Sequence, residues 1–437
     1  MPTESDPDQL PEAEVSQTEP PASDIQPSRN GEYPTAGEAV SEPRTGKASS
    51  SVTSGPAAAE DSCAVSSGRL GSAVHAGDTV APVRIPGPGP WAALVWTLSI
   101  FVFHLLGILI SGVVLFAFNV EVLQEIAADP QLAKQILEPF LKDRTFFLIG
   151  GEMLVFVLIA MIAARWQHGP QMARILGLRR IPLPALILIV SAVVPVSLLC
   201  SGLHEKALPV WEYIADRAPA LDVFSEMNVN QQLGPLSESV PAWALLLVIA
   251  VAPAIGEELI FRGIIGHGLV ARYGIRAGVL LTSMYFAIVH IHPAHVLTLM
   301  PLALFLHISW LATRSFYAPV LIHFLNNALA VFVLKNAAQL KEAARVNNAE
   351  ETGWLVILLA ALVLIPAVLS LWRNRIEYRL HDESRWTPGY DTAGMPPDGI
   401  EATAVMEVRD PWLYGTGILL CGGLTLVCIF ETLNALR

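Results

Sequence analysis

Long apolar runs dominate the chain from residue 91 onward, and they constrain its fold more than any other feature. Each is close to the ~20 residues that an α-helix needs to cross the ~30 Å hydrocarbon core of a bilayer. The runs are 91–118, 146–164, 182–203, 241–262, 275–292, 295–312, 318–334, 353–372 and 411–433. They predict an all-α, polytopic transmembrane helical bundle of about 8–9 spans, and hence an integral, multi-pass protein of the cell membrane.

Residues 1–90 have a different composition. They hold 13 acidic and 5 basic residues, a net charge of −8 out of −12 for the whole chain. Pro, Ser, Glu, Ala and Gly are abundant and apolar clusters are few, so the segment buries too little surface to offset its ordering entropy. It predicts a disordered acidic tail. Nowhere does the chain carry the basic surface that nucleic-acid binding requires, so we exclude nucleic acid as a partner.

Short basic loops predict the orientation of the spans. The loop 165–180 carries four arginines and no acidic residue, and short loops rich in Lys and Arg stay in the cytoplasm. Alternation of the spans then places the 263–274 turn, Arg314 and the basic cluster 373–379 on the cytoplasmic side. The same count predicts a cytoplasmic N-terminal tail.

Three charged side chains interrupt the run 241–262: Glu257, Glu258 and Arg262. An ionised side chain at the centre of a membrane helix costs about 2.5–3.5 kcal/mol on insertion scales, so such a cluster needs a reason. Glu258 and Arg262 are four residues apart and can pair on one helix face. Glu257 points about 100° away and has no partner within its helix. Glu257 is therefore the candidate catalytic carboxylate. The alternative is that its side chain reaches the membrane interface and is solvated there.

His290 lies on the next run, at the same sequence distance as Glu257 from the Tyr273-Gly274 turn. In an antiparallel hairpin, residues equidistant from the turn lie at the same height. A carboxylate and an imidazole that face each other can hold and deprotonate a water molecule. The alternative is a core histidine that only satisfies its own hydrogen bonds.

His323 and Asn327 form a second polar pair, again four residues apart on one helix face. Both can donate hydrogen bonds to a developing oxyanion, although polar residues also join helices in membrane bundles. With Glu257 and His290 they would supply a base, a water and oxyanion donors for hydrolysis of an acyl bond. His323 comes roughly two helical turns after the Arg314–Pro319 turn and should lie shallower than His290. Either the short span tilts, or the site opens as a funnel toward the cytoplasm.

Three motifs in this order resemble the CPBP family of intramembrane proteases, which includes the Rce-type CAAX prenyl endopeptidases and bacterial abortive-infection relatives. The motifs are Glu257-Glu258-x-x-x-Arg262, Phe286-x-x-x-His290 and His323-x-x-x-Asn327. The resemblance implies a protease core over 145–335, after a span and loop at 91–144 and before two further spans with a cytoplasmic loop at 336–437.

The resemblance also implies roles for these residues. Glu257 and His290 would activate the attacking water, and His323 and Asn327 would form the oxyanion hole. Glu258 and Arg262 would brace the site, and Phe286 would pack beside His290. The implied substrate is a peptide or prenylated peptide, cleaved by an endopeptidase embedded in the lipid bilayer, with CAAX-type processing as one possibility.

Metal dependence is left open by the resemblance, because the family has been described both as zinc-dependent and as glutamate-type. If zinc is used, Glu257, His290 and His323 are the ligands that the sequence offers. The HExxH helix of zinc proteases is missing, which favours a metal-free water.

Other functions fit part of the pattern. Buried Glu, His and Arg also mark translocation paths, so a proton- or ion-coupled transporter is the main alternative. It predicts inverted repeats, and the sequence shows no convincing one. A non-catalytic membrane scaffold is a third possibility. The isolated His104, Glu152 and His307 are expected to form hydrogen bonds between helices.

Overall fold

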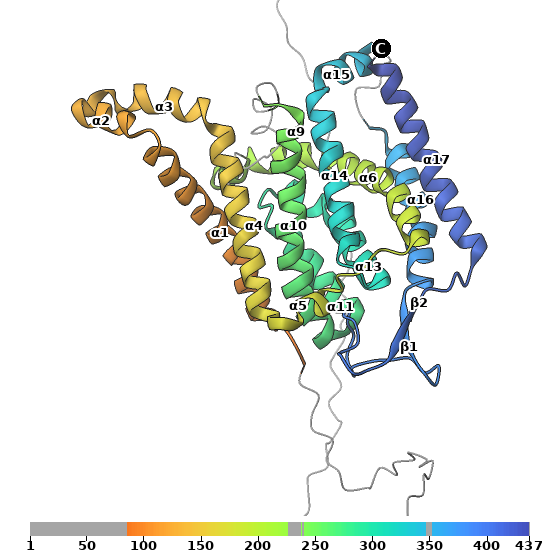
Figure 1. Cartoon of the computed structure of the whole chain (residues 1–437). Helices are drawn as coiled ribbons and strands as arrows, with labels where there is room; N and C mark the ends of the chain where they lie inside the picture. The colour runs from red at the N-terminus through yellow and green to blue at the C-terminus, as the bar shows by residue number, and fades with distance from the viewer. Residues whose placement is uncertain (1–84, 226–236, 238–239, 347–351, 437) are drawn as a thin grey trace, which may run out of the picture. The chain divides into compact units, whose positions relative to one another are not determined.

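Helices make up nearly all the regular structure in the computed structural model, which describes residues 85–225, 237, 240–346 and 352–436 (Figure 1). The first are α1 (Pro90–Ala117), α2 (Val120–Ala128), η1 (Pro130–Leu132), α3 (Ala133–Asp143), α4 (Thr145–His168), η2 (Gly169–Gln171), α5 (Met172–Leu176), α6 (Leu183–Ala215), η3 (Pro219–Leu221) and α7 (Asp222–Ser225). The central elements are α9 (Ala242–Leu245), η4 (Leu246–Val251), α10 (Ala252–Glu258), η5 (Leu259–Gly266), α11 (His267–Ile288), α12 (Pro293–Thr298) and α13 (Met300–Thr313). The last are α14 (Tyr317–Lys335), α15 (Ala337–Val346), α16 (Trp354–Arg373), β1 (Glu377–Leu380), β2 (Ala402–Val405) and α17 (Pro411–Ala435).

Within the described residues, seven helices are long and apolar enough to cross a membrane. The polytopic helical bundle is therefore confirmed, but the number of spans differs from the nine apolar runs. Two runs join in one helical stretch of 47 residues, Ala242–Ile288, that bends in the middle. The run 295–312 is split into α12 and α13 because Pro301, at the second position of α13, has no N–H to continue the preceding helix. With 14 residues, α13 is about 21 Å long, too short for the bilayer core.

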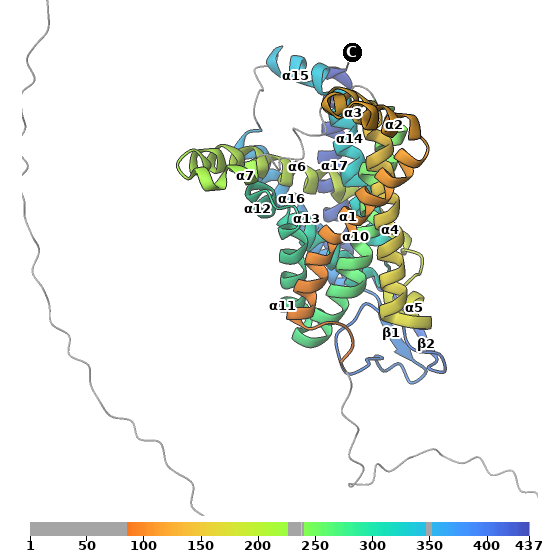
Figure 2. The same ribbon diagram turned by 90° about the vertical axis from the view of Figure 1, so that its left-hand side faces the viewer.

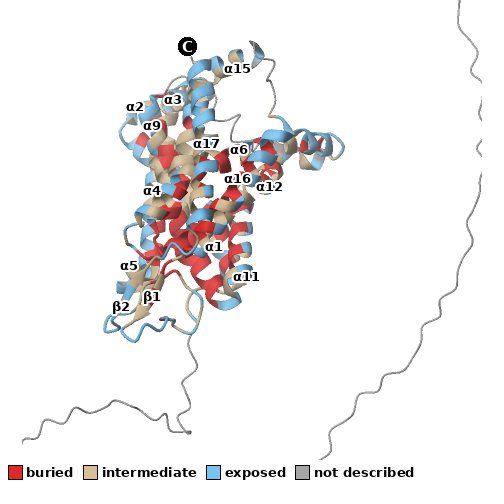
Figure 3. Cartoon of the chain, turned by 90° about the vertical axis from the view of Figure 1, so that its right-hand side faces the viewer, coloured by how far each residue is buried: buried red, intermediate tan, exposed pale blue. Residues whose placement is uncertain are grey.

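The helices form three groups. α1 packs along α4 on one side, and α6, α16 and α17 pack on one another on the other side, with α10, α11, α13 and α14 between them (Figure 1). Apolar side chains on α1, α4 and α17 are largely exposed, and most buried residues lie in the central helices and in α6 and α16 (Figure 3). An exposed apolar face of this extent is what a membrane helix presents to lipid. The candidate site residues lie on the central helices and on η5, except His290, which lies in the turn just after the end of α11 and not within a span as the sequence predicted.

Gly274 bends the long stretch into two antiparallel arms. Its backbone has φ 73° and ψ 175°, a conformation that only glycine adopts readily. Beyond the bend the arms touch closely, since a Cβ on Gly278 would lie 2.5 Å from Cα of Val270. The hairpin predicted around Tyr273-Gly274 is thus present.

The basic segments gather at one end of the molecule. α5, the bend of α11 and the β1–β2 ribbon all lie at the lower end in Figures 1 and 2, away from α2, α3 and α15. This grouping agrees with the predicted topology; that this end faces the cytoplasm stays a prediction. α1 begins at the same end, where Arg272 donates a 2.8 Å hydrogen bond to the Gly87 carbonyl. Ile85–Gly89, the end of the predicted tail, therefore lie beside α11, and residues 1–84 of that tail are outside the described residues.

The loop between α16 and α17 has a fold that the sequence pattern did not predict. β1 and β2 pair antiparallel, from Glu377 opposite Val405 to Leu380 opposite Ala402. Strands of four residues are too short to show a clear alternation of apolar and polar residues. The loop also contacts the helices, because the Met395 amide donates a 3.0 Å hydrogen bond to the Arg174 carbonyl.

The isolated polar residues of the spans have different environments. His104 and Glu152 join α1 to α4 through a 2.8 Å contact between Nδ1 and Oε1, as predicted. The prediction for His307 was wrong: both its ring nitrogens are buried without a hydrogen-bond partner in the described part of the chain. Its ring instead packs edge-on against Trp310 and lies directly over Gly266. A Cβ at residue 266 would be only 2.6 Å from His307 Cε1, so this contact requires glycine there.

Candidate active site

α10 carries Glu257 and Glu258 between two π-helical segments, η4 and η5. Wide turns of this kind occur often at functional sites. Pro253 accounts for one irregularity, since it has no N–H for the carbonyl one turn earlier, that of Ile249. The Asn327 side-chain amide donates a 3.0 Å hydrogen bond to that carbonyl. Pro253 thus leaves the Ile249 carbonyl free to accept the hydrogen bond that orients Asn327 of α14.

Glu258, Arg262 and His323 form a fully buried charged cluster. Glu258 Oε1 accepts a 2.8 Å hydrogen bond from Arg262 Nη1 and a 3.0 Å hydrogen bond from His323 Nδ1. Arg262 Nη2 donates to the Ala303 carbonyl at 3.0 Å. A buried charge is tolerated only when it is paired and hydrogen-bonded. The cluster therefore ties α10 and η5 to α13 and α14, and Glu258 and Arg262, both without exposed surface, are too enclosed to meet a substrate directly.

The ring of Phe286 lies among these groups. The guanidinium of Arg262 is 4.7 Å from its centroid, and the ring centroids of His290 and His323 are 5.4 and 5.7 Å away. Both imidazoles thus flank one aromatic ring. His290 and His323 therefore lie at depths close enough for both rings to contact the same phenylalanine.

Glu257 and His290 form the accessible part of the site. Both side chains are half-buried, whereas Glu258, Arg262 and His323 are buried. The two groups are close enough to interact electrostatically, and Glu257 Oε2 has no hydrogen-bond partner within the described residues. His290 Nδ1 lies 3.1 Å from the Phe286 carbonyl. A carbonyl only accepts, so Nδ1 carries the proton and Nε2 has the free lone pair.

A chain of amide hydrogen bonds extends the site toward α6. The Ser197 hydroxyl donates to Asn326 Oδ1 at 2.8 Å, and Asn326 Nδ2 donates to Asn327 Oδ1 at 3.1 Å. Ser197 and Asn326 were not among the site residues predicted from the sequence. The adjacent Asn326-Asn327 pair was the available signal, but only Asn327 shares the four-residue spacing with His323.

The alternative zinc ligands do not form a metal site in this arrangement. Across the part of the chain that the structure describes, no group of three or more His, Cys, Asp or Glu side chains is placed to hold a metal ion. His323 Nδ1 donates to Glu258 and His290 Nδ1 to the Phe286 carbonyl, so Nε2 is the free nitrogen of each ring.

Comparison with known protein families identifies the central part of the chain. Residues 239–329 match the model of the type II CAAX prenyl endopeptidase, Rce1-like family. This segment is therefore similar to the Rce1-like domain. The resemblance inferred from the three motifs is confirmed, and the matched segment contains the described residues from α9 to the middle of α14. No curated protein and no solved structure matches the chain.

The Rce1-like match, with the seven apolar helices, makes the chain an integral membrane protein and supports an intramembrane protease of the CAAX type in general terms. It covers about one fifth of the 437 residues.

Proposed function

We propose that the chain is an intramembrane endopeptidase in which Glu257 and His290 activate the attacking water and His323 with Asn327 stabilises the oxyanion. The supporting observation is the division of the polar residues into two layers. In the buried layer, Glu258 pairs with both Arg262 and His323. In the half-buried layer, Glu257 Oε2 has no hydrogen-bond partner within the described residues, and His290 Nε2 keeps its lone pair. Two neighbouring groups with free acceptor atoms are what the activation of a water nucleophile requires.

Water activation follows from the hydrogen bond that fixes His290. With its proton on Nδ1, the imidazole presents Nε2 as an acceptor for one hydrogen of a water. The Glu257 carboxylate accepts the other hydrogen and takes it as the water oxygen bonds to the scissile carbonyl carbon. The protonated Glu257 then gives this proton to the leaving amide nitrogen as the C–N bond breaks. The products are a carboxylic acid and an amine, and Glu257 returns to its ionised form.

Oxyanion stabilisation would come from α14. Asn327 uses one amide hydrogen on the Ile249 carbonyl, and its second hydrogen remains for the substrate. His323 donates from Nδ1 to Glu258, so it donates from Nε2 only as an imidazolium. The buried Glu258 carboxylate stabilises that cation, as a buried acid does in a catalytic triad. The cluster thus has a chemical role in addition to its structural one.

The substrate class follows from the family match. Type II CAAX endopeptidases are prenyl proteases by description, and a prenylated peptide suits a site reached through lipid. We expect the chain to cleave a prenylated C-terminal peptide and to prefer it over the same peptide without the prenyl group.

The test is cleavage of a farnesylated peptide by the purified full chain in proteoliposomes, read by mass spectrometry. Glu257→Gln keeps the size of the side chain but removes its basicity, so we expect cleavage to fall by at least about 10²-fold, the usual contribution of general acid–base catalysis. The matched control is Glu152→Gln, a membrane-embedded glutamate that pairs with His104 on α1. This variant should retain cleavage. Normal cleavage by Glu257→Gln would refute the proposed base.

A further inference from the structure

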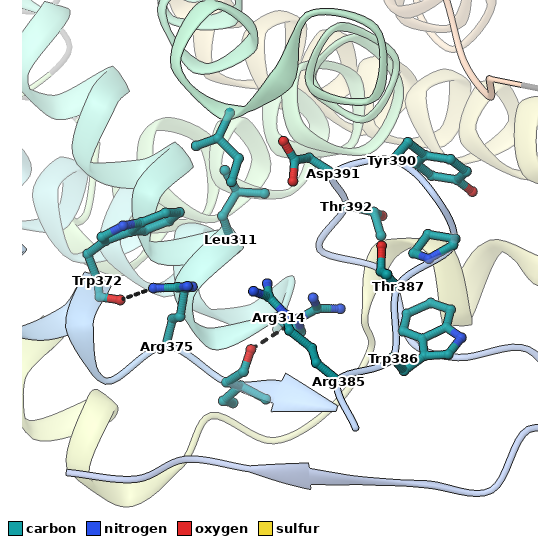
Figure 4. A pocket seen from close by; sticks show the side chains of 13 residues that line it. Leu311, Arg314, Trp372, Arg375, Arg385, Trp386, Thr387, Tyr390, Asp391 and Thr392 are labelled. Atoms are coloured by element: carbon teal, nitrogen blue, oxygen red, sulfur yellow. Dashed lines mark hydrogen bonds between the residues drawn. The ribbon is translucent and has the colours of Figure 1, made fainter. Parts of the chain in front are cut away.

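A pocket of about 240 Å³ lies at the basic end of the bundle, remote from the candidate active site (Figure 4). Helix ends form one wall: Ile275 begins the second arm of α11, Leu311 is near the end of α13 and Trp372 near the end of α16. The loop between α16 and α17 forms the other wall. Ile275 is 13 residues, about 20 Å, from the end of α11 at Ile288, beyond which His290 lies. The pocket shares no residue with the proposed protease site.

Three arginines line this pocket: Arg314, Arg375 and Arg385. Their guanidinium groups gather in the middle of the pocket in Figure 4, and Arg385 interacts electrostatically with both of the others. Burial, the largest cause, and the neighbouring Arg385 lower the pKa of Arg314 to about 10, which leaves it charged at neutral pH. Asp391 is the acidic residue of the lining, so the lining carries a net charge of +2.

Glu377 lies behind these arginines and neutralises them only in part. Its carboxylate is 3.4 Å from Arg375 and 3.7 Å from Arg385, but 2.9 Å from Arg409, which does not line the pocket. The shortest ion pair of Glu377 is therefore made outside the pocket. Arg314 has no carboxylate at ion-pair distance within the described residues, and donates instead to the Ile376 and Gly394 carbonyls.

Two threonine hydroxyls face the arginines from the loop (Figure 4). Thr387 Oγ1 accepts a hydrogen bond from the Gly389 amide, and Thr392 Oγ1 accepts one from the Gly394 amide. Because each hydroxyl oxygen is used as an acceptor, its hydrogen is left to donate. Guanidinium and hydroxyl donors converging on one cavity are the donor set that binds phosphate.

We propose that this pocket binds a phosphate monoester or diester group, held by Arg375 and Arg385 with Thr387 and Thr392. The volume is below the roughly 300–1,000 Å³ of drug-sized ligand sites, which suits a headgroup and excludes an acyl chain. Trp372 and Trp386 also line the pocket, and tryptophan is enriched at the membrane–water interface. Basic pockets between membrane helices at this level accept anionic headgroups. A phospholipid headgroup and a soluble phosphate ester carry the same chemistry.

Binding is tested with the full chain in nanodiscs of phosphatidylcholine, with or without phosphatidylglycerol, and in detergent with inorganic phosphate or glycerol phosphate. Thermal stability and native mass spectrometry report the bound ligand. Arg385→Gln removes a half-exposed guanidinium that makes no hydrogen bond to the backbone of the described residues, so the variant should fold, and we expect binding to weaken roughly ten- to a hundredfold. Asp391→Asn removes the acidic group of the lining, and binding should strengthen roughly five- to tenfold.

Arg379→Gln is the matched control. It removes the same charge from the same loop, but Arg379 pairs with Glu407 and neither residue lines the pocket, so binding should be unchanged. A response to phosphatidylglycerol alone assigns the site to a lipid headgroup, and an equal response to the soluble ligands assigns it to a free phosphate ester. No response to either source would overturn the proposal. Equal losses in Arg385→Gln and Arg379→Gln would also overturn it, because general surface charge would then explain the binding.

Discussion

Breaking the buried pair of Glu258 and Arg262 should destabilise the protein more than removing the pair altogether. Arg262→Met deletes two charge-assisted hydrogen bonds, to Glu258 Oε1 and to the Ala303 carbonyl. At about 1.5–3 kcal/mol each, their loss amounts to about 3–6 kcal/mol. This range overlaps the roughly 3–5 kcal/mol usually lost when one partner of a buried ion pair is removed. Glu258 would be left with His323 as its partner, and its Oε2 already lacks one in the described residues.

The double variant Glu258→Met/Arg262→Met removes both charges and fills the space with apolar atoms. Such replacements are often neutral or stabilising, so the double variant should be more stable than Arg262→Met by about 2 kcal/mol or more. Unfolding by SDS, followed by circular dichroism, gives the free energies of unfolding of both singles and the double.

The control for this cycle is the exposed pair of Glu342 and Arg345 on α15. Loss of that pair should change the free energy of unfolding by less than about 1 kcal/mol. If the double variant of the buried pair is destabilised by the sum of its single variants, the two charges are not coupled and the reasoning fails.

Three further predictions concern other parts of the molecule. Gly274→Ala forces a side chain into a conformation essentially reserved for glycine, so SDS unfolding should show a loss of about 1–3 kcal/mol. Asn327→Leu leaves the Ile249 carbonyl without its partner and should cost about 1–3 kcal/mol in the same assay. Burial alone would raise the pKa of Glu377, but the arginines around it hold that pKa below its ordinary value. The stability this adds to the β1–β2 ribbon is complete above the ordinary pKa and lost as pH falls through the lowered one. Hydrogen exchange of the ribbon should show this loss, and Glu377→Gln should abolish it.

Features set by spacing along one helix or across one bend could be predicted from the sequence. Glu258 and Arg262 pair because residues four apart share a helix face. The bend at Gly274 follows from a glycine between two apolar runs, and it brings Glu257 and His290 close enough to interact. In both cases a local geometric rule decides the outcome.

Features that depend on contacts between distant segments could not be predicted. Spacing placed His323 and Asn327 on one face but did not show that His323 bonds to Glu258 or that Asn327 bonds to the Ile249 carbonyl. Those partners follow from how α14 lies against α10 and η4. The break between α12 and α13 was not predicted, because the run 295–312 was defined by its apolar residues and Pro301 within it was not treated as a helix break. The folding of the loop after α16 depends on backbone hydrogen bonds to Arg174 and to Ala312, which have no signature in the loop itself.

The interlocking of α6 with α16 and α17 limits how far the chain can be shortened. At one crossing, a Cβ on Gly417 of α17 would lie 3.0 Å from Cα of Ala367 on α16, so these backbones are nearly in contact. The ribbon between them is bonded to the segment before α6 and to the end of α13. A version that stopped after the matched segment would remove both helices that pack on α6 and expose that face of α6. Attempts to trim this chain for crystallisation, or to graft its centre onto another scaffold, should therefore keep everything through α17.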